Sequence, residues 1–236
     1  MIPFNPACGT RMTGDERKMS IISCCIPLFA KKGFEGTTTK DIAEASQVSE
    51  ALLYRHFKSK DDIYEAIREN ICKSKDGVIK HFETLPLTTE SLVFILYFIL
   101  LVINHNHRDP VRAAIPRLFL MSSLEDGKFV REFNEIKFGP VLPIIEKLYE
   151  HGKKKGEISN AASLNPKQVM WFAYHVSTGL KTGSLPGKIY DYGVDQQTLI
   201  QDALRFVLRG IGVKEEIIHS LNLPEIQRSM EEIFPE

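Results

Sequence analysis

The chain has 236 residues, of which 43% are hydrophobic and 25% are charged, and its formal net charge is zero. This composition excludes wholesale disorder, and the neutral balance excludes a protein that simply coats nucleic acid. The charge is uneven, because residues 1–60 hold nine Lys or Arg against six Asp or Glu. The length favours one large domain accompanied by a small module.

The cysteines and the apolar segments indicate the compartment. Cys8, Cys24, Cys25 and Cys72 show no C-x-x-C spacing, which favours a reduced, intracellular protein. The longest apolar run, residues 92–103, is shorter than the ~20 residues that span a bilayer, and no signal-peptide pattern opens the chain. We therefore expect a cytoplasmic protein without a membrane segment.

Residues 1–14 mix Pro, Gly and Thr without periodicity, which predicts a flexible leader. A first helix should begin near Asp15, because apolar residues then recur at helical spacing, and it should stop at Gly33, with Phe34 closing the C-cap. Pro27 lies inside this pattern and predicts a kink.

Three further helices follow, each with its own start signal. Thr38, with Asp41 three residues later, predicts a capping box and a two-turn helix that buries Ile42 and Ala45. After the turn at residues 46–48, Ser49 is a good N-cap for a second short helix. Its Leu53 and Phe57 lie on one face, and we expect both in the core. Ser59 and Asp62 predict the start of a third helix that runs to about His81.

The rest of the chain is predicted to be helical, because apolar residues recur three and four positions apart. No segment alternates apolar and polar residues with period two. We predict an all-α fold. The expected helices cover residues 89–104, 110–122, 127–151, 166–182 and 196–209, with Pro116, Pro140 and Pro143 kinking or dividing two of them. Residues 183–194 should form a loop, and one or two short helices should follow residue 213.

Two short helices joined by a tight turn form the geometry that places a second helix in a major groove. At this point residues 28–67 (LFAKKGFEGTTTKDIAEASQVSEALLYRHFKSKDDIYEAI) resemble the tetracycline-repressor (TetR) family of bacterial regulators. The similarity covers only about residues 15–70. It implies a helix-turn-helix DNA-binding domain over residues 15–60, a helical ligand-binding and dimerisation domain over 61–212 and a helical tail over 213–236.

The predicted DNA contacts lie in and around the two short helices. Thr39 and Lys40, with the cap Thr38, open a helix whose N-terminal end suits a phosphate, and Lys60 opens another. The residues expected to face DNA are Thr38, Thr39, Lys40, Ser49, Glu50, Ala51, Tyr54, His56 and Lys60. For Thr38, Ser49 and Ser59, pure helix capping is the alternative, whereas Tyr54 could be a packing residue and Lys60 a solvated one.

Two residues depart from the family's pattern. Gln47 stands where the family often has Gly, so either its backbone is left-handed, at a cost of ~1 kcal/mol, or the turn differs. Glu50 is acidic on the face that must approach a polyanion; it could accept a hydrogen bond from cytosine, yet phosphates would repel it.

The remaining half carries candidates for a small-molecule site. Aromatic residues with few polar groups suit a largely apolar pocket. The candidates are Tyr97, Phe98, Arg117, Phe138, Trp171, Tyr174 and His175. Most of these could equally be core residues. Arg117 is expected to pair with a ligand carboxylate or with an internal Glu.

A helix-turn-helix of this type works as a pair, which predicts a homodimer and a palindromic operator in double-stranded DNA. The family resemblance implies a four-helix bundle built from the last two long helices. The predicted interface residues are Val169, Ala173, Val176, Leu180, Ile200, Ala203, Leu204 and Val207, and the alternative is that they pack within their own subunit.

The sequence thus favours a ligand-responsive DNA-binding regulator, a repressor released from its operator by a small, largely apolar molecule. A helical ligand-binding protein or enzyme without a DNA role is the alternative. No nucleophile with a base, paired carboxylates or phosphate loop stands at a usable spacing, so we expect no enzyme and no cofactor. His105 and His107 lack a nearby third ligand, so we expect no metal site.

Overall fold

The computed structural model describes residues 12–72, 77–161, 163–185, 187 and 189–233. Within these ranges the chain is built from helices without a strand, and one isolated bridge joins Ile158 to Val213. The predicted all-α fold is confirmed. Most of the predicted leader lies outside the described residues, and Gly14 already belongs to the first helix, α1.

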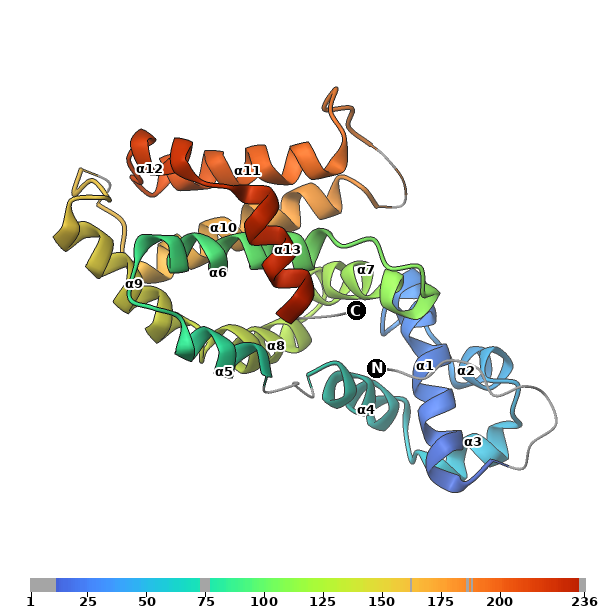
Figure 1. Ribbon diagram of the computed structural model, residues 1–236. Helices are drawn as coiled ribbons and strands as arrows, with labels where there is room; N and C mark the ends of the chain where they lie inside the picture. Colours follow the sequence, from blue (N-terminus) through green and yellow to red (C-terminus); the bar gives the residue numbers. More distant parts are fainter. Residues whose placement is uncertain (1–11, 73–76, 162, 186, 188, 234–236) are drawn as a thin grey trace. The chain divides into compact units, whose positions relative to one another are not determined.

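The helices begin and end close to the predicted residues, as Figure 1 shows in chain order. Their bounds are α1 Gly14–Lys32, α2 Thr39–Ala45, α3 Glu50–His56, α4 Lys60–Cys72, α5 Gly77–Thr84, α6 Thr89–Asn104, α7 Pro110–Leu124, α8 Lys128–Phe138, α9 Leu142–Lys155, α10 Pro166–Thr182, α11 Gln196–Gly210, α12 Glu215–Ser220 and α13 Leu223–Ile233.

Some of the prolines interrupt a helix, whereas others lie inside a continuous helix. The predicted helix over 127–151 is divided into α8 and α9 around Pro140, whereas α1 and α7 continue through Pro27 and Pro116. A proline lacks the N–H that would bond the carbonyl four residues earlier, so each continuous helix gives up one bond. The helix predicted to run from Ser59 to His81 is represented by α4 and α5, with residues 73–76 between them outside the described ranges.

The described residues form two compact units. The first comprises the described parts of 1–74 and 106–136, and the second those of 75–105 and 137–236. The first unit therefore contains α7 and most of α8 in addition to α1–α4. This division does not coincide with the predicted boundary after residue 60, and the assignment of DNA binding and ligand binding to separate segments stays a prediction.

The core of the first unit is built around α1. Ile21, Cys25 and Phe29 are fully buried there, and they share one apolar cluster with Leu53 of α3 and Phe129 of α8. A helix of seven residues is unstable alone in water, so α2 and α3 depend on this packing. Ala45, which we expected in the core, is exposed, and Ala43 is buried instead.

The core of the second unit surrounds α6, which is buried along most of its length and packs against α9, α10 and α11. A buried polar contact ends it, because Asn104 Nδ2 donates to Ser177 Oγ of α10 at 2.8 Å. Helices α10 and α11 lie side by side (Figure 1). No described helix combines the length and the apolar character that a membrane crossing requires.

Candidate nucleic-acid interface

Helix α2 begins with the predicted capping box. The Thr38 hydroxyl accepts the N–H of Asp41 at 3.1 Å, and the Asp41 carboxylate accepts the N–H of Thr38 at 2.9 Å. Lys32 at the end of α1 donates to the same carboxylate at 2.7 Å. The hydrogen bond from Lys32, followed by the one from the Thr38 backbone, lowers the pKa of Asp41 from 3.8 to about 2. The end of α1 and the start of α2 are thereby joined.

The turn between α2 and α3 occupies residues 46–48, as predicted. The N–H of Val48 donates to the carbonyl of Ala43 at 2.9 Å, which closes the turn. Gln47 has φ = 54°, the only positive value of a non-glycine residue in the described ranges. The left-handed alternative for Gln47 is therefore the correct one, and it stores strain of ~1 kcal/mol in this turn.

Helix α3 buries one face and exposes the other. Ser49 caps it by accepting the N–H of Leu52 at 3.1 Å, and Leu53 and Phe57 lie in the core. Ala51 and Tyr54 are exposed, with Tyr54 retaining 51% of its accessible surface. The exposed face is thus held in place by the buried one, which is what a helix that enters a groove requires.

The start of α4 is capped by side chains of its own first turn. The Ser59 hydroxyl accepts the N–H of Asp62, and the Asp62 carboxylate accepts the N–H of Lys58. Lys60 does not extend into solvent, because its Nζ donates to the backbone oxygen of Phe34 at 2.8 Å.

The predicted contact residues divide into three groups. The hydroxyls of Thr38 and Ser49 serve as caps, and Thr39 donates to the carboxylate of Glu50 at 3.2 Å. Contacts of these residues with DNA stay a prediction. Lys60 is bound to Phe34, and His56 is half-buried. Lys40, Ala51 and Tyr54 are exposed, as are Thr38, Ser49 and Glu50.

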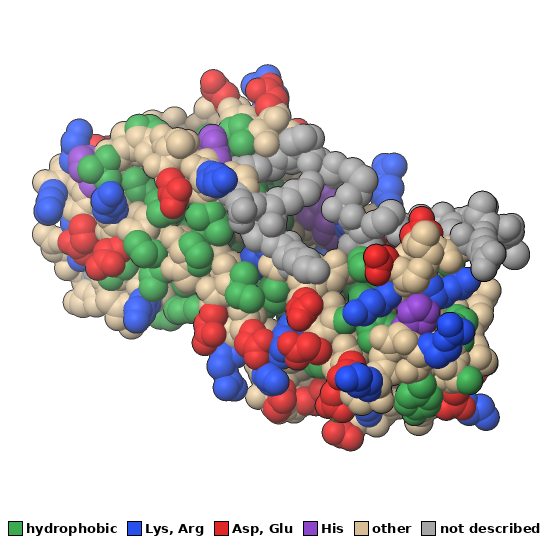
Figure 2. All heavy atoms as spheres, turned by 90° about the horizontal axis from the view of Figure 1, so that it is seen from below, with side chains coloured by type: hydrophobic (Ala, Val, Ile, Leu, Met, Phe, Trp, Pro, Cys, Tyr) green, Lys and Arg blue, Asp and Glu red, His purple; other side chains and the backbone are tan. Residues whose placement is uncertain are grey.

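Two exposed basic residues were missed by the sequence analysis. Arg55 is the neighbour of Tyr54 at the end of α3, and Lys58 follows the helix. The signal was available, since Arg55 lies four positions after Ala51 on a helix whose buried residue, Leu53, was already identified. Figure 2 shows one face of the molecule, on which basic and acidic side chains are interspersed and do not separate into a field of one sign.

A family model described as "Bacterial regulatory proteins, tetR family" matches residues 21–67, which span most of α1, all of α2 and α3 and the first half of α4. Over these residues the chain is similar to the tetR family of bacterial regulatory proteins. Curated relatives are similar to a short part of this chain. The biofilm operon regulator IcaR of Staphylococcus aureus is 50% identical over 48 residues, and the uncharacterized regulator YvkB of Bacillus subtilis is 36% identical over 63.

These alignments cover 20% and 27% of this chain, and only 26% of IcaR and 33% of YvkB. The similarity to solved structures extends much further along the chain. A crystal structure of AibR in complex with isovaleryl coenzyme A and operator DNA superposes with a TM-score of 0.60, covering 84% of this chain and all of AibR at 17% identity. At this identity the likeness shows the fold alone.

Four of the predicted ligand residues lie together in the second unit. The ring of Phe138 is 5.9 Å from that of Trp171 and 5.2 Å from that of Tyr174, and the ring of His175 is 6.3 Å from that of Trp171. The rings meet mostly edge to face, a favourable aromatic geometry.

The other three lie elsewhere. Tyr97 is fully buried and donates its hydroxyl to Gln227 of α13, and Phe98 packs edge-on against Phe82. Arg117 belongs to the first unit, where its Nε donates to the backbone oxygen of Ala30 at 2.8 Å. The guanidinium of Arg117 thus binds the end of α1, and its place in a ligand site stays a prediction.

The predicted interface residues are directed inward. Val169, Ala173, Ile200, Ala203, Leu204 and Val207 are buried in the core of the second unit, and Val176 and Leu180 pack against that core. These side chains thus pack within the subunit, and their place in a dimer interface stays a prediction. The exposed apolar residues of α10 and α11 are Phe172, with 46% of its surface accessible, and Phe206, with 69%.

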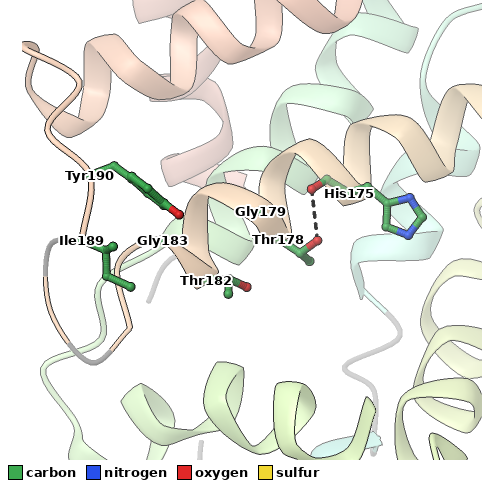
Figure 3. A pocket seen from close by; sticks show the side chains of 7 residues that line it. All are labelled: His175, Thr178, Gly179, Thr182, Gly183, Ile189 and Tyr190. Atoms are coloured by element: carbon green, nitrogen blue, oxygen red, sulfur yellow. Dashed lines mark hydrogen bonds between the residues drawn. The ribbon is translucent and has the colours of Figure 1, made fainter. Parts of the chain in front are cut away.

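A shallow depression of about 350 Å³ lies at the C-terminal end of α10. Figure 3 shows that its lining comes from one side of this helix, including His175, Thr178 and Thr182, and from Ile189 and Tyr190 of the following loop. The depression is open and lies on the exposed side of α10. Within the described residues no group of three or more His, Cys, Asp or Glu is placed to hold a metal ion.

Proposed function

We propose that this protein is a ligand-responsive transcriptional regulator that binds duplex DNA through α3, and that it acts as a repressor. The observation that carries the proposal is the arrangement of α3, which is capped by Ser49, fixed from behind by Leu53 and Phe57, and exposed at Ala51 and Tyr54. A short rigid helix with an exposed N-terminal face is the element that reads base edges in a major groove.

The charges near α3 support the same proposal. Lys40 on α2, Arg55 on α3 and Lys58 just after it are exposed. In protein–DNA complexes such residues supply the phosphate contacts that set orientation and affinity, whereas contacts to bases set specificity. We assign phosphate contacts to these three cations and groove contacts to Ala51 and Tyr54.

The proposal includes a homodimer, because two recognition helices are needed for the two halves of a palindromic operator. Phe172 and Phe206 are large apolar side chains exposed on adjacent helices. Gly179 and Gly210 lie on the same two helices, and a side chain at either position would meet no other atom within 4 Å. We propose that the exposed sides of α10 and α11 bind a second copy of the chain, while their buried sides hold the subunit core.

For the effector we propose a small, largely apolar molecule that binds beside the aromatic group of Phe138, Trp171, Tyr174 and His175. These residues supply apolar surface with a few polar atoms, the composition of most small-molecule sites. The effector would favour one arrangement of α4 and thereby change the separation of the two recognition helices. The name of IcaR as a negative regulator supports repression, and the AibR complex suggests acyl-coenzyme A compounds as effectors to test.

The experiment is selection of duplexes from a random-sequence library by the wild-type protein, followed by titration of the selected duplex. We expect enrichment of an inverted repeat, and a loss of affinity when a matching compound from a panel of apolar molecules and acyl-coenzyme A thioesters is added. Enrichment of no sequence would contradict the operator, and a selected duplex whose binding no compound changes would contradict ligand control.

A further inference from the structure

The backbone of Phe34, in the turn between α1 and α2, is held from both sides. Its N–H donates to Oε1 of Glu125 at 2.9 Å, and its carbonyl accepts from Nζ of Lys60 at 2.8 Å. Glu125 is the C-terminal cap residue of α7, and Lys60 is the first residue of α4. One peptide segment therefore connects two helices that are distant from it in sequence, all within the first unit.

Lys60 has a second contact with the same residue. Its Nζ lies 4.1 Å from the centroid of the Phe34 ring, a cation–π geometry. That ring packs edge-on against Tyr64 of α4, with centroids 5.1 Å apart, and lies parallel to Phe29 of α1. The ammonium group of Lys60 is thus bonded to a carbonyl and covers an aromatic face, and its side chain is partly buried.

Gly33 makes the contact with Glu125 possible. It has φ = 72°, which side-chain-bearing residues rarely adopt, and a Cβ at this position would lie 2.6 Å from Oε1 of Glu125. The carboxylate can reach the N–H of Phe34 only because residue 33 has no side chain. Thr37 adds a hydrogen bond from its hydroxyl to the carbonyl of Gly33 at 2.7 Å, so the turn is fixed up to the cap of α2.

We propose that Lys60 and Glu125 are positioning residues for DNA binding, and that Lys60 acts through Phe34 and not through a phosphate of the DNA. The inference rests on the proposed function. Together the two side chains hold the α1–α2 turn, and with it the start of α2, at a fixed place against α4 and α7. The start of α2 is in turn joined to α3 by the hydrogen bond from Thr39 to Glu50, so the two residues support the helix proposed to enter the groove.

The salt dependence of binding separates the two roles of a lysine. Each phosphate contact contributes about 0.9 to the slope of log affinity against log salt concentration, because it releases condensed counterions. A lysine that only positions other residues changes affinity without changing that slope. Lys60→Met should therefore lower the affinity for a mixed-sequence duplex about ten-fold at every salt concentration, the scale of one hydrogen bond to a charged group.

Lys40→Met is the matched control, since it makes the same substitution at an exposed position on α2. We expect it to reduce the slope by about 0.9, the contribution of a single phosphate neutralised by one lysine. A Lys60→Met variant whose slope falls by the same amount as that of Lys40→Met would overturn the inference. If the wild-type protein shows no salt-dependent binding to the duplex, the proposed function itself fails, and this outcome is distinct from a changed slope.

Substitution of Glu125 gives a second test, in which the direction of the change in DNA affinity is decisive. This test suffices if Lys60→Met does not fold. Removing an acidic side chain should raise affinity for DNA if only charge mattered. We expect Glu125→Ala to lower it about ten-fold, because the N–H of Phe34 loses its acceptor, and Glu125→Gln to restore binding, because the amide oxygen can accept the same bond. Glu125→Ala binding as tightly as wild type, or more tightly, would contradict a positioning role.

Discussion

The hydroxyl of Thr39 donates a hydrogen bond to the carboxylate of Glu50 at 3.2 Å, which joins the first turn of α2 to the first turn of α3. Two residues predicted as separate DNA contacts are therefore partners of one another. In this arrangement Glu50 fixes the approach of the two helices and leaves a negative charge beside the proposed groove-facing surface.

Replacing that charge should strengthen non-specific DNA binding. Glu50→Gln retains an oxygen that accepts from Thr39 but removes the repulsion between the carboxylate and the phosphates. We expect the affinity for a mixed-sequence duplex at low salt to rise about two- to five-fold, equivalent to ~0.4–1 kcal/mol, in a fluorescence anisotropy titration. Glu44→Gln, at an exposed position on α2, is the control for a change in net charge alone. A decrease for Glu50→Gln would contradict repulsion between Glu50 and the phosphates.

Glycine at position 47, in the turn between α2 and α3, should stabilise the protein relative to the native Gln47. Gln47 has φ = 54°, so Gln47→Gly relieves strain of ~1–2 kcal/mol while adding backbone freedom to the unfolded chain. We expect the free energy of unfolding to rise by ~0.5–1 kcal/mol in urea titrations. Gln47→Ala keeps the Cβ atom and should remain close to wild type. Equal stability of the glycine and alanine variants would show that the turn is not strained.

Several features could be predicted from the sequence because their causes are local. Thr38, Ser49 and Asn165 bond to N–H groups only three residues away, so their presence indicates where α2, α3 and α10 begin. The left-handed backbone at Gln47 was one of two predicted alternatives, because the resembled family often has Gly at this position.

Contacts between residues distant in sequence could not be predicted in this way. The acceptor of Arg117 is a carbonyl 87 positions earlier, and nothing near Arg117 in the sequence indicates it. The apolar residues of α10 were predicted to contact a partner chain, and several of them lie in the core of the second unit. Val169 and Phe172 are both apolar and lie on different sides of the helix, so the pattern alone does not say which side faces the core.

The contact between α1 and α2 should respond to acid. The pKa of Asp41 is lowered from 3.8 to about 2, mainly by Lys32, so its ionised form stabilises the folded state. This stabilisation is complete above about pH 4 and is lost as the pH falls through the folded-state pKa. The difference in unfolding free energy between wild type and Asp41→Asn should therefore shrink between pH 4 and pH 2, and added salt should reduce it because the pair is near the surface. A difference that is independent of pH would contradict the assignment.

The dimer proposal predicts which substitution separates the chains. Phe206→Glu places a charge on the exposed side of α11, and we expect the dimer dissociation constant to rise at least about 30-fold, the ~2 kcal/mol of an interface hot spot. Leu124→Glu makes a similar change at a residue of α7 that is 73% exposed, and it should leave the constant unchanged. Sedimentation equilibrium measures both. If Phe206→Glu remains as dimeric as wild type, the interface lies elsewhere.

The most direct test of the central proposal, that α3 is presented to duplex DNA, compares one charge placed at two exposed alanines. Asp at position 51 suits the first turn of a helix, so Ala51→Asp should fold normally while repelling phosphates, and Ala161→Asp introduces the same charge in the second unit. We predict that Ala51→Asp lowers the affinity for the selected duplex at least about ten-fold, or ~1.4 kcal/mol, and that Ala161→Asp changes it by less than about two-fold. Equal affinities for the two variants would contradict the proposal.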